Sequence, residues 1–328
     1  MKLGIIGAGK IVHELLTFIG DIDGIDLVAI AATARSRDKL EDLSEKYNIS
    51  AYYTDYKDLI KDPNVEVCYV ALPNNLHYEV MDYALDFGKD VICEKPFAGN
   101  LREAEAIFNK AFSKNLLVME AISIPFINNF KLIKEKIKDL GQIRLVSFNY
   151  SQYSSRYDDF KKGIIRPAFS RKAYGGALMD INYYNIALAV NLFGKPNKIE
   201  YFANINKDID TSGVLMMDYG DFKLTAIGAK DSEVKSYNII QADQASLYIE
   251  GPSSTLESFS IKKVGDREIK TFNENLNVNR LFYEFKEFER IIRDRDFSRA
   301  KELKENTLLT MELLTKARKS IDLRFTCD

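Results

Sequence analysis

Three observations predict an α/β protein with two sheet-containing regions. Near the N-terminus, an apolar run at 3–6 leads directly into a glycine turn and a segment with helical spacing. Up to Glu120, short apolar runs alternate with amphipathic segments, which predicts a doubly wound parallel sheet. Beyond it the runs acquire period two, which predicts a second α/β region with a large, mostly antiparallel sheet. We therefore expect two domains, 1–120 and 121–328.

The elements of the first region follow from its apolar runs. Strands are expected at 3–6, 26–32, 51–53, 65–72, 91–93 and 116–119. Helices are expected between them, at 11–19, 38–47, 56–61, 78–87 and 101–113. The first helix shows the pattern, since Ile11, Leu15 and Phe18 recur at helical spacing. Parallel sheets of this kind bind ligands at the carboxyl ends of their strands.

The first turn of the chain reads Gly7-Ala8-Gly9-Lys10-Ile11. Gly7 permits a tight turn, and Gly9 lets the backbone approach a pyrophosphate at the positive end of the helix dipole. Val12 stands where the dinucleotide-binding pattern has its third glycine. The turn therefore predicts a nicotinamide dinucleotide site, with an ordinary strand–helix turn as the alternative.

The residues after the second strand bear on the choice of nucleotide. NAD-binding proteins place an acid here for the ribose, but no carboxylate occurs within 30–37. Arg35, Ser36 and Arg37 suit a 2′-phosphate instead, which favours NADP over NAD. In the alternative, Ser36 only caps the next helix and the arginines are solvated, while Asp38 keeps NAD possible.

Charged residues follow the fifth strand, where 91–93 lead into Glu94-Lys95-Pro96. Pro96 has no N–H for a sheet ladder, so it ends the strand and favours an extended Lys95. An amine and a carboxylate are thus held at the edge where parallel sheets bind ligands. The alternative is a solvated charge pair before a turn.

The second region combines period-two strands with a few helices. Strands are expected at 143–151, 199–204, 213–219, 222–228, 237–242 and 245–250, and helices at 128–140, 177–193, 279–293 and 305–320. A long loop is expected at 153–174, before a pair of glycines. Asp180 and Tyr184 lie four residues apart in one helix and should share a face. The alternative is a packing turn with a half-buried tyrosine.

Composition excludes several classes of function. The net charge of −2 gives no basic excess for nucleic acid or acidic lipid. Three cysteines and two histidines show no metal-ligand spacing and no disulfide framework. No apolar run reaches the roughly 20 residues of a membrane span, and the chain starts directly with a strand rather than a signal peptide. We expect a cytoplasmic protein.

Four segments in this order resemble the family of glucose–fructose oxidoreductase and inositol dehydrogenase, the Gfo/Idh/MocA family. They are Gly7-Ala8-Gly9, Leu72-Pro73-Asn74-Asn75-Leu76-His77, Glu94-Lys95-Pro96 and Gly175-Gly176-Ala177-Leu178-Met179-Asp180-Ile181. The resemblance covers nearly the whole chain. It implies a Rossmann domain and a C-terminal α/β domain for substrate, whose open sheet forms homodimers or homotetramers. It also implies hydride transfer between NAD(P) and a secondary alcohol or ketone of a sugar, polyol or diol.

The resemblance also implies the residues of the site. Cofactor contacts are expected at Gly7, Ala8, Gly9, Lys10, Ile11, Arg35, Ser36, Leu72, Pro73, Asn74, His77, Glu94 and Lys95. Lys95, Asp180 and Tyr184 are expected to be catalytic. Most members carry histidine where Tyr184 stands, and this chain resembles the dihydrodiol and xylose dehydrogenase branch, which has tyrosine there.

Tyr184 is the expected acid/base. Free tyrosine has a pKa of about 10, which a nearby ammonium lowers, and Lys95 is the candidate. In the alternative, Lys95 itself binds the substrate oxygen. Asp180 is expected to orient the substrate hydroxyl or Lys95.

Two other functions occur among relatives of this kind. One is NAD-dependent glycoside hydrolysis through transient oxidation, with no net turnover of the cofactor. The other is a non-catalytic nucleotide-sensing regulator, as in the galactose-pathway repressor of yeasts. The presence of both Lys95 and a titratable Tyr184 argues against the regulator.

Overall fold

The computed structural model describes residues 1–277 and 279–328, which form two compact units. Unit 1 comprises Met1–Ile122 and Leu281–Leu308, and unit 2 comprises Ser123–Arg280 and Leu309–Asp328. A segment far along the chain therefore packs with the N-terminal unit. The assignment of substrate binding and oligomerisation to the region beyond residue 120 stays a prediction.

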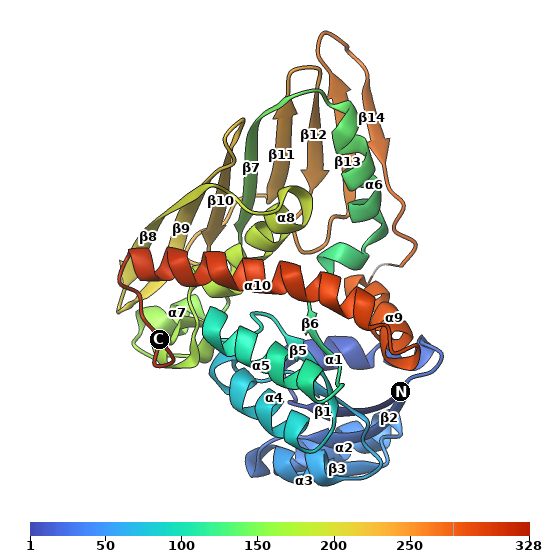
Figure 1. Cartoon of the computed structure of the whole chain (residues 1–328). Helices are drawn as coiled ribbons and strands as arrows, with labels where there is room; N and C mark the ends of the chain where they lie inside the picture. The colour runs from blue at the N-terminus through green and yellow to red at the C-terminus, as the bar shows by residue number, and fades with distance from the viewer. Residues whose placement is uncertain (278) are drawn as a thin grey trace. The chain divides into compact units, whose positions relative to one another are not determined.

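Unit 1 is built on a parallel sheet with strand order β3-β2-β1-β4-β5-β6 (Figure 1). Its strands are β1 (Lys2–Ile6), β2 (Asp26–Ala31), β3 (Ala51–Tyr53), β4 (Val67–Val70), β5 (Asp90–Glu94) and β6 (Val118–Ala121). Its helices are α1 (Lys10–Leu16), α2 (Arg37–Tyr47), α3 (Tyr56–Lys61), α4 (His77–Asp86), α5 (Leu101–Ser113) and α9 (Arg280–Arg293). This order confirms the predicted doubly wound sheet, and the order reverses between β1 and β4, where such sheets bind nucleotides.

The core of unit 1 explains why its sequence is so apolar. All residues of β4 are buried, as a strand covered on both faces requires. Helices α4 and α5 pack side by side (Figure 1). The returning helix α9 completes the core, since the ring of Phe285 meets that of Tyr69 edge-on, with centroids 5.2 Å apart.

Unit 2 contains a larger sheet with strand order β14-β13-β12-β11-β7-β10-β9-β8 (Figure 1). Its strands are β7 (Ile143–Ser151), β8 (Lys198–Asn206), β9 (Ile209–Asp218), β10 (Lys223–Ala229), β11 (Tyr237–Ala242), β12 (Ala245–Glu250), β13 (Ser258–Lys263) and β14 (Ile269–Phe272). Neighbours are antiparallel except β7 and β10, which confirms a mostly antiparallel sheet. Strands β13 and β14 were not predicted, because serine and lysine interrupt their apolar pattern.

The helices of unit 2 are few, and two of them, α6 and α8, pack on strands of this sheet. They are α6 (Asn128–Lys136), α7 (Tyr157–Lys161) and α8 (Tyr183–Phe193), while α10 (Phe297–Ser320) has residues in both units. Helix α8 packs on β7 and β10. Within the described residues, no helix is long and apolar enough to cross a membrane.

The predicted loop at 153–174 and the predicted start of the last helix differ from the structure. The expected loop 153–174 contains α7 and the 3-10 turns Pro167–Phe169 and Arg171–Ala173, because Phe160 and Phe169 stack in a small core of their own. Helix α10 starts eight residues earlier than predicted, at Phe297 instead of 305. The ring of Phe297 lies 6.3 Å from that of Phe112, so the first turn of α10 is packed rather than exposed.

Candidate active site

The glycine turn joins the end of β1 to the start of α1. Gly7 has a φ of 128°, and a Cβ built there would lie 2.2 Å from the carbonyl oxygen of Ala71, so only glycine fits. Gly9 is the N-cap residue of α1 and has no capping side chain. No heavy atom lies within 4 Å of a Cβ built on Gly9, so the backbone here is open to a ligand. A phosphate group requires such an approach.

A lysine that the sequence analysis did not assign lies at this turn. The carbonyl oxygen of Ala8 accepts a hydrogen bond from Nζ of Lys39, in the first turn of α2. Lys10 and Lys39 are both exposed, and Ile11 is half-buried. The position of Lys39 depends on β1 and β2 lying side by side, which the spacing of 31 residues does not reveal.

Arg35 and Ser36 lie in the 3-10 turn that follows β2. Ser36 occupies the N-cap position of α2, but its side chain makes no capping hydrogen bond. The alternative in which Ser36 only caps this helix is therefore not supported. Arg35 is exposed, and among the described residues its guanidinium has no hydrogen bond or ion pair.

His77 connects two of the predicted cofactor loops. It is fully buried, with Nε2 2.9 Å from the carbonyl oxygen of Leu72 and Nδ1 3.0 Å from that of Pro96. Burial lowers the pKa of the imidazole. The ring thus ties the loop after β4, which carries Pro73 and Asn74, to the loop after β5. A direct contact of His77 with the cofactor stays a prediction.

The loop after β5 is anchored on both sides of Lys95. The Oη of Tyr69 donates to Oε1 of Glu94 at 2.6 Å, and burial raises the pKa of Tyr69, which keeps this donor protonated. The backbone N–H of Phe97 donates to Oε1 of the buried Glu120 at 2.9 Å. Lys95 is half-buried between these anchors, and the Lys95–Pro96 peptide bond is cis.

The predicted nucleotide residues of unit 1 thus lie at the carboxyl ends of β1, β2, β4 and β5 or directly after them. The open N-terminus of α1 suits a diphosphate, and the exposed Arg35 suits a 2′-phosphate. On these observations the residues present fit a nicotinamide dinucleotide.

In unit 2, Asp180 belongs to a π-helical turn and not to a regular α-helix. This turn spans Leu178–Asn182 and leads into α8, which ends at Gly194 with a φ of 73°. The end of the helix was predicted correctly, but its first turn is wider than predicted. Turns of this kind are frequent at functional sites.

Tyr184 is buried in an aromatic setting. Its ring lies 5.9 Å from that of Tyr150 and 6.1 Å from that of Tyr183. The guanidinium of Arg280 lies 5.9 Å from the centroid of the Tyr184 ring. Arg280 was not predicted as a site residue, because nothing in its local sequence links it to the helix of Tyr184.

Polar groups hold α8 in place. The Oγ of Ser253 donates to Oδ1 of Asn185 at 2.7 Å, and Nδ2 of Asn185 donates to the carbonyl oxygen of Ile227 at 2.8 Å. Asn185 and Ser253 are fully buried, so these bonds are costly to break. The helix that carries Tyr184 is thereby fixed to β10.

Asp180 has a partner that the sequence analysis did not find. Its Oδ2 accepts a hydrogen bond from Nζ of Lys230 at 2.6 Å. The two residues are 50 positions apart, and Lys230 directly follows β10. The expectation that Asp180 orients a substrate hydroxyl or Lys95 stays a prediction.

Each unit also has a hollow of its own. In unit 2, a hollow of about 460 Å³ is lined by Tyr150, Gln152, Glu233 and Lys235 among others, beside the ring that packs on Tyr184.

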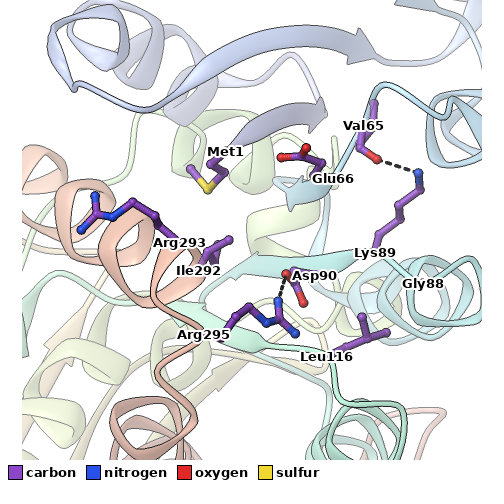
Figure 2. Close-up of a pocket in the computed structure, with 10 residues that line it drawn as sticks. All are labelled: Met1, Val65, Glu66, Gly88, Lys89, Asp90, Leu116, Ile292, Arg293 and Arg295. Atoms are coloured by element: carbon purple, nitrogen blue, oxygen red, sulfur yellow. Dashed lines mark hydrogen bonds and ion pairs between the residues drawn. The ribbon is translucent and has the colours of Figure 1, made fainter.

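The hollow in unit 1 measures about 440 Å³ and lies at the amino ends of β4 and β5 (Figure 2). Figure 2 shows Asp90 paired with Arg295, at 2.5 Å, and Lys89 donating to the carbonyl oxygen of Val65. Dinucleotides bind at the opposite edge of such sheets, so this hollow is not the cofactor site.

The fold and the residues of unit 1 define an NAD(P)-dependent oxidoreductase. Residues 1–122 match the model of an oxidoreductase family with an NAD-binding Rossmann fold, Gfo/Idh/MocA. The matched residues include three of the four segments that resemble the family, at 7–9, 72–77 and 94–96.

Curated relatives support the same family and branch. The scyllo-inositol 2-dehydrogenase (NADP(+)) IolU of Bacillus subtilis is 29% identical, over 100% of this chain and 99% of its own. The trans-1,2-dihydrobenzene-1,2-diol dehydrogenase of Mus musculus is also 29% identical, over 67% of this chain and 65% of its own.

Solved structures share the fold across both units. A 3-ketoreductase from Actinomadura kijaniata, in complex with NADP and TDP-benzene, superimposes with a TM-score of 0.85 at 19% identity, over 97% of each chain. A levoglucosan dehydrogenase in complex with NADH and levoglucosan has a TM-score of 0.79 at 18% identity, over 98% of this chain and 97% of its own.

Proposed function

We propose that this protein oxidises a secondary alcohol of a sugar, polyol or diol with NADP as hydride acceptor, or catalyses the reverse reduction. The observation that carries the proposal is the open, uncapped start of α1 at Gly9 together with the exposed Arg35. The substrate class is supported by the relatives, which are named as an inositol dehydrogenase, a dihydrobenzenediol dehydrogenase, a 3-ketoreductase and a levoglucosan dehydrogenase.

In this proposal each catalytic residue has one task. The bound nicotinamide supplies the hydride acceptor at its C4. Tyr184 removes the hydroxyl proton of the substrate, and Lys95 stabilises negative charge on the substrate or phenol oxygen. Asp180 accepts a hydrogen bond from a substrate hydroxyl and so orients it. The glycine turn and the loops after β4 and β5 hold the nucleotide.

The test is a panel of alcohols offered with NADP⁺ and with NAD⁺. The panel contains scyllo-inositol, other inositols, levoglucosan, monosaccharides and trans-diols, and reduced nicotinamide is followed by its absorbance. We expect turnover of at least one alcohol, faster with NADP⁺. Release of nitrophenol from nitrophenyl glycosides without net cofactor reduction would instead indicate a glycoside hydrolase. Nucleotide binding without any turnover would indicate a regulator.

Substitution of Arg35 tests the choice of nucleotide. We expect Arg35→Ala to weaken NADP(H) binding by about 1.5–3 kcal/mol, because a charged hydrogen bond to the 2′-phosphate is lost. NAD(H) binding should change little. Calorimetric titration of both nucleotides measures this, with Lys46→Ala as control, since Lys46 is an exposed cation at the far end of α2, the helix that follows the turn of Arg35. Equal losses for both nucleotides would give Arg35 a structural role only.

The sheet of unit 2 supports a homo-oligomer. Its register places Leu145, Phe202, Met216 and Tyr248 on one face, and all four are exposed, while Val146 on the other face is buried. Exposed apolar side chains that gather on one face of a sheet are typical of an interface. We propose that two copies of the chain pair through it, as a dimer or within a tetramer.

Light scattering at micromolar concentration tests this assembly. We expect the mass of at least a dimer for the unchanged protein. Met216→Asp should lower the mass, because it buries a charge in the interface. Val264→Asp is the control, since Val264 is exposed in the turn between β13 and β14. A monomer for the unchanged protein would refute the proposal.

A further inference from the structure

Lys230, the buried lysine at the end of β10, takes part in none of the steps of the proposed reaction. Only 3% of the Lys230 side chain is exposed. Its Nζ donates to Oδ2 of Asp180 at 2.6 Å and to the carbonyl oxygen of Ala168 at 2.7 Å, and lies 4.5 Å from the centroid of the Phe169 ring. Burying an ammonium group has a large desolvation cost. A buried lysine that contacts a candidate catalytic carboxylate therefore calls for a functional explanation.

The backbone around Lys230 is fixed by the sheet. Its N–H donates to the carbonyl oxygen of Thr211 at 2.8 Å, and its carbonyl oxygen accepts from the N–H of Ser154 at 2.9 Å. Lys230 therefore projects from a rigid strand end toward Asp180. The ammonium is also linked indirectly to the glycine pair before the helix. The carbonyl oxygen of Ala168, which accepts from Nζ of Lys230, also accepts from the N–H of Gly176 at 3.2 Å.

A second carboxylate, on β9, holds the start of the same π-helical turn. Oδ2 of Asp210 accepts from the N–H of Leu178 at 2.6 Å and from Oη of Tyr201 at 2.8 Å. A Cβ built on Gly176, whose φ is 106°, would lie 2.0 Å from Oδ1 of Asp210, so the chain must have glycine here. Asp210 thus holds the backbone of the turn, while Lys230 contacts the side chain of Asp180.

We propose that Lys230 is a positioning residue that holds the carboxylate of Asp180 in the orientation needed to receive the substrate hydroxyl. The inference rests on the proposed function, because it assumes that Asp180 binds substrate. Lys230 touches neither substrate nor cofactor in this role. It acts through Asp180, and the wide π turn needs this support because it presents Asp180 outside a regular helix.

The test is a double-substitution cycle on the full chain. Lys230→Met, Asp180→Asn and the double variant are compared with the unchanged protein, using NADP⁺ and the alcohol of the panel that is oxidised fastest. We expect Lys230→Met to lower kcat/KM for the alcohol by roughly 10- to 100-fold, the usual effect of a misplaced group, with the KM for NADP⁺ unchanged. In the Asp180→Asn background, Lys230→Met should cause little further loss, because residues that act through one another are not additive.

Lys207 offers a matched control. Its Nζ donates to the carbonyl oxygen of Phe160 at 2.6 Å and lies 5.0 Å from the ring of Phe160, but it has no carboxylate partner among the described residues. Lys207→Met should keep kcat/KM near that of the unchanged protein. Thermal unfolding of each variant, with rates expressed per folded molecule, separates stability from activity.

The outcomes separate this inference from the function on which it rests. If Asp180→Asn lowers kcat/KM but Lys230→Met does not, the positioning role is wrong and the proposed function stands. If Lys230→Met lowers kcat/KM equally with and without Asp180, its effect is general to the fold and the inference is overturned. If Asp180→Asn itself has no effect, the proposed role of Asp180 falls, and the inference falls with it.

Discussion

Replacing Tyr184 by phenylalanine is expected to lower turnover of the best alcohol by about 10²–10⁴-fold, the usual contribution of a positioned acid/base group. The substitution removes only the hydroxyl, so the ring contacts with Tyr150 and Tyr183 remain and the protein should stay folded. NADP⁺ binding should also remain, because the predicted nucleotide residues lie in unit 1. Steady-state rates across neutral and alkaline pH, with a binding titration for NADP⁺, measure both expectations.

The control for this substitution is Tyr219→Phe. The Oη of Tyr219 donates to the carbonyl oxygen of Gly194 at 3.1 Å, at the far end of the helix that carries Tyr184. Tyr219→Phe therefore removes a hydroxyl group and its hydrogen bond in the same unit, at a residue that has no part in the proposed reaction. If Tyr184→Phe retains full turnover at every pH, Tyr184 is a packing residue and another group carries the proton.

Replacing Lys95 by methionine is expected to do comparable damage. Methionine preserves most of the length of the side chain but removes the ammonium, and with it the charge that stabilises a developing oxyanion. The anchors on either side, Tyr69 to Glu94 and Phe97 to Glu120, should keep the loop after β5 in place. We therefore expect a loss in kcat rather than in the stability of the fold.

Lys89→Met is the matched control, at the opposite end of the same strand. The Nζ of Lys89 donates to the carbonyl oxygens of Asp62 and Val65, so its loss affects packing and not the proposed chemistry. If Lys95 and Tyr184 serve the same proton transfer, the variant lacking both should be little worse than either single variant. Fully multiplicative losses would show that the two residues act in separate steps.

Much of unit 1 was accessible from sequence because its signals are local. The apolar runs and the helical spacing between them depend on neighbouring residues only, and they gave the parallel sheet and the turn at Gly7. The requirement for glycine at Gly7 is visible in the sequence, but its cause, the carbonyl oxygen of Ala71, comes from the adjacent strand β4. The same holds for Lys39, which reaches Ala8 only because two strands lie side by side.

Only part of the candidate site of unit 2 could be predicted from the sequence. Asp180 and Tyr184 could be picked out by their spacing and by family resemblance, since both lie on one short segment. Lys230 and Arg280 could not, because they reach that segment from distant parts of the chain. Nor did the spacing reveal the π turn, at whose start the N–H of Leu178 donates to Oδ2 of the distant Asp210.

The fold class, the glycine turn, the Lys95–Pro96 strand end and the candidates Asp180 and Tyr184 could be predicted from contiguous residues alone. The groups that support them became visible in the folded chain: His77 contacts two loops, Glu120 accepts from the N–H of Phe97, and Lys230 donates to Asp180. These supports are buried polar groups whose partners lie elsewhere in the chain. Burial obliges such groups to find partners, but which partners they find is set by how the strands are ordered in the sheets.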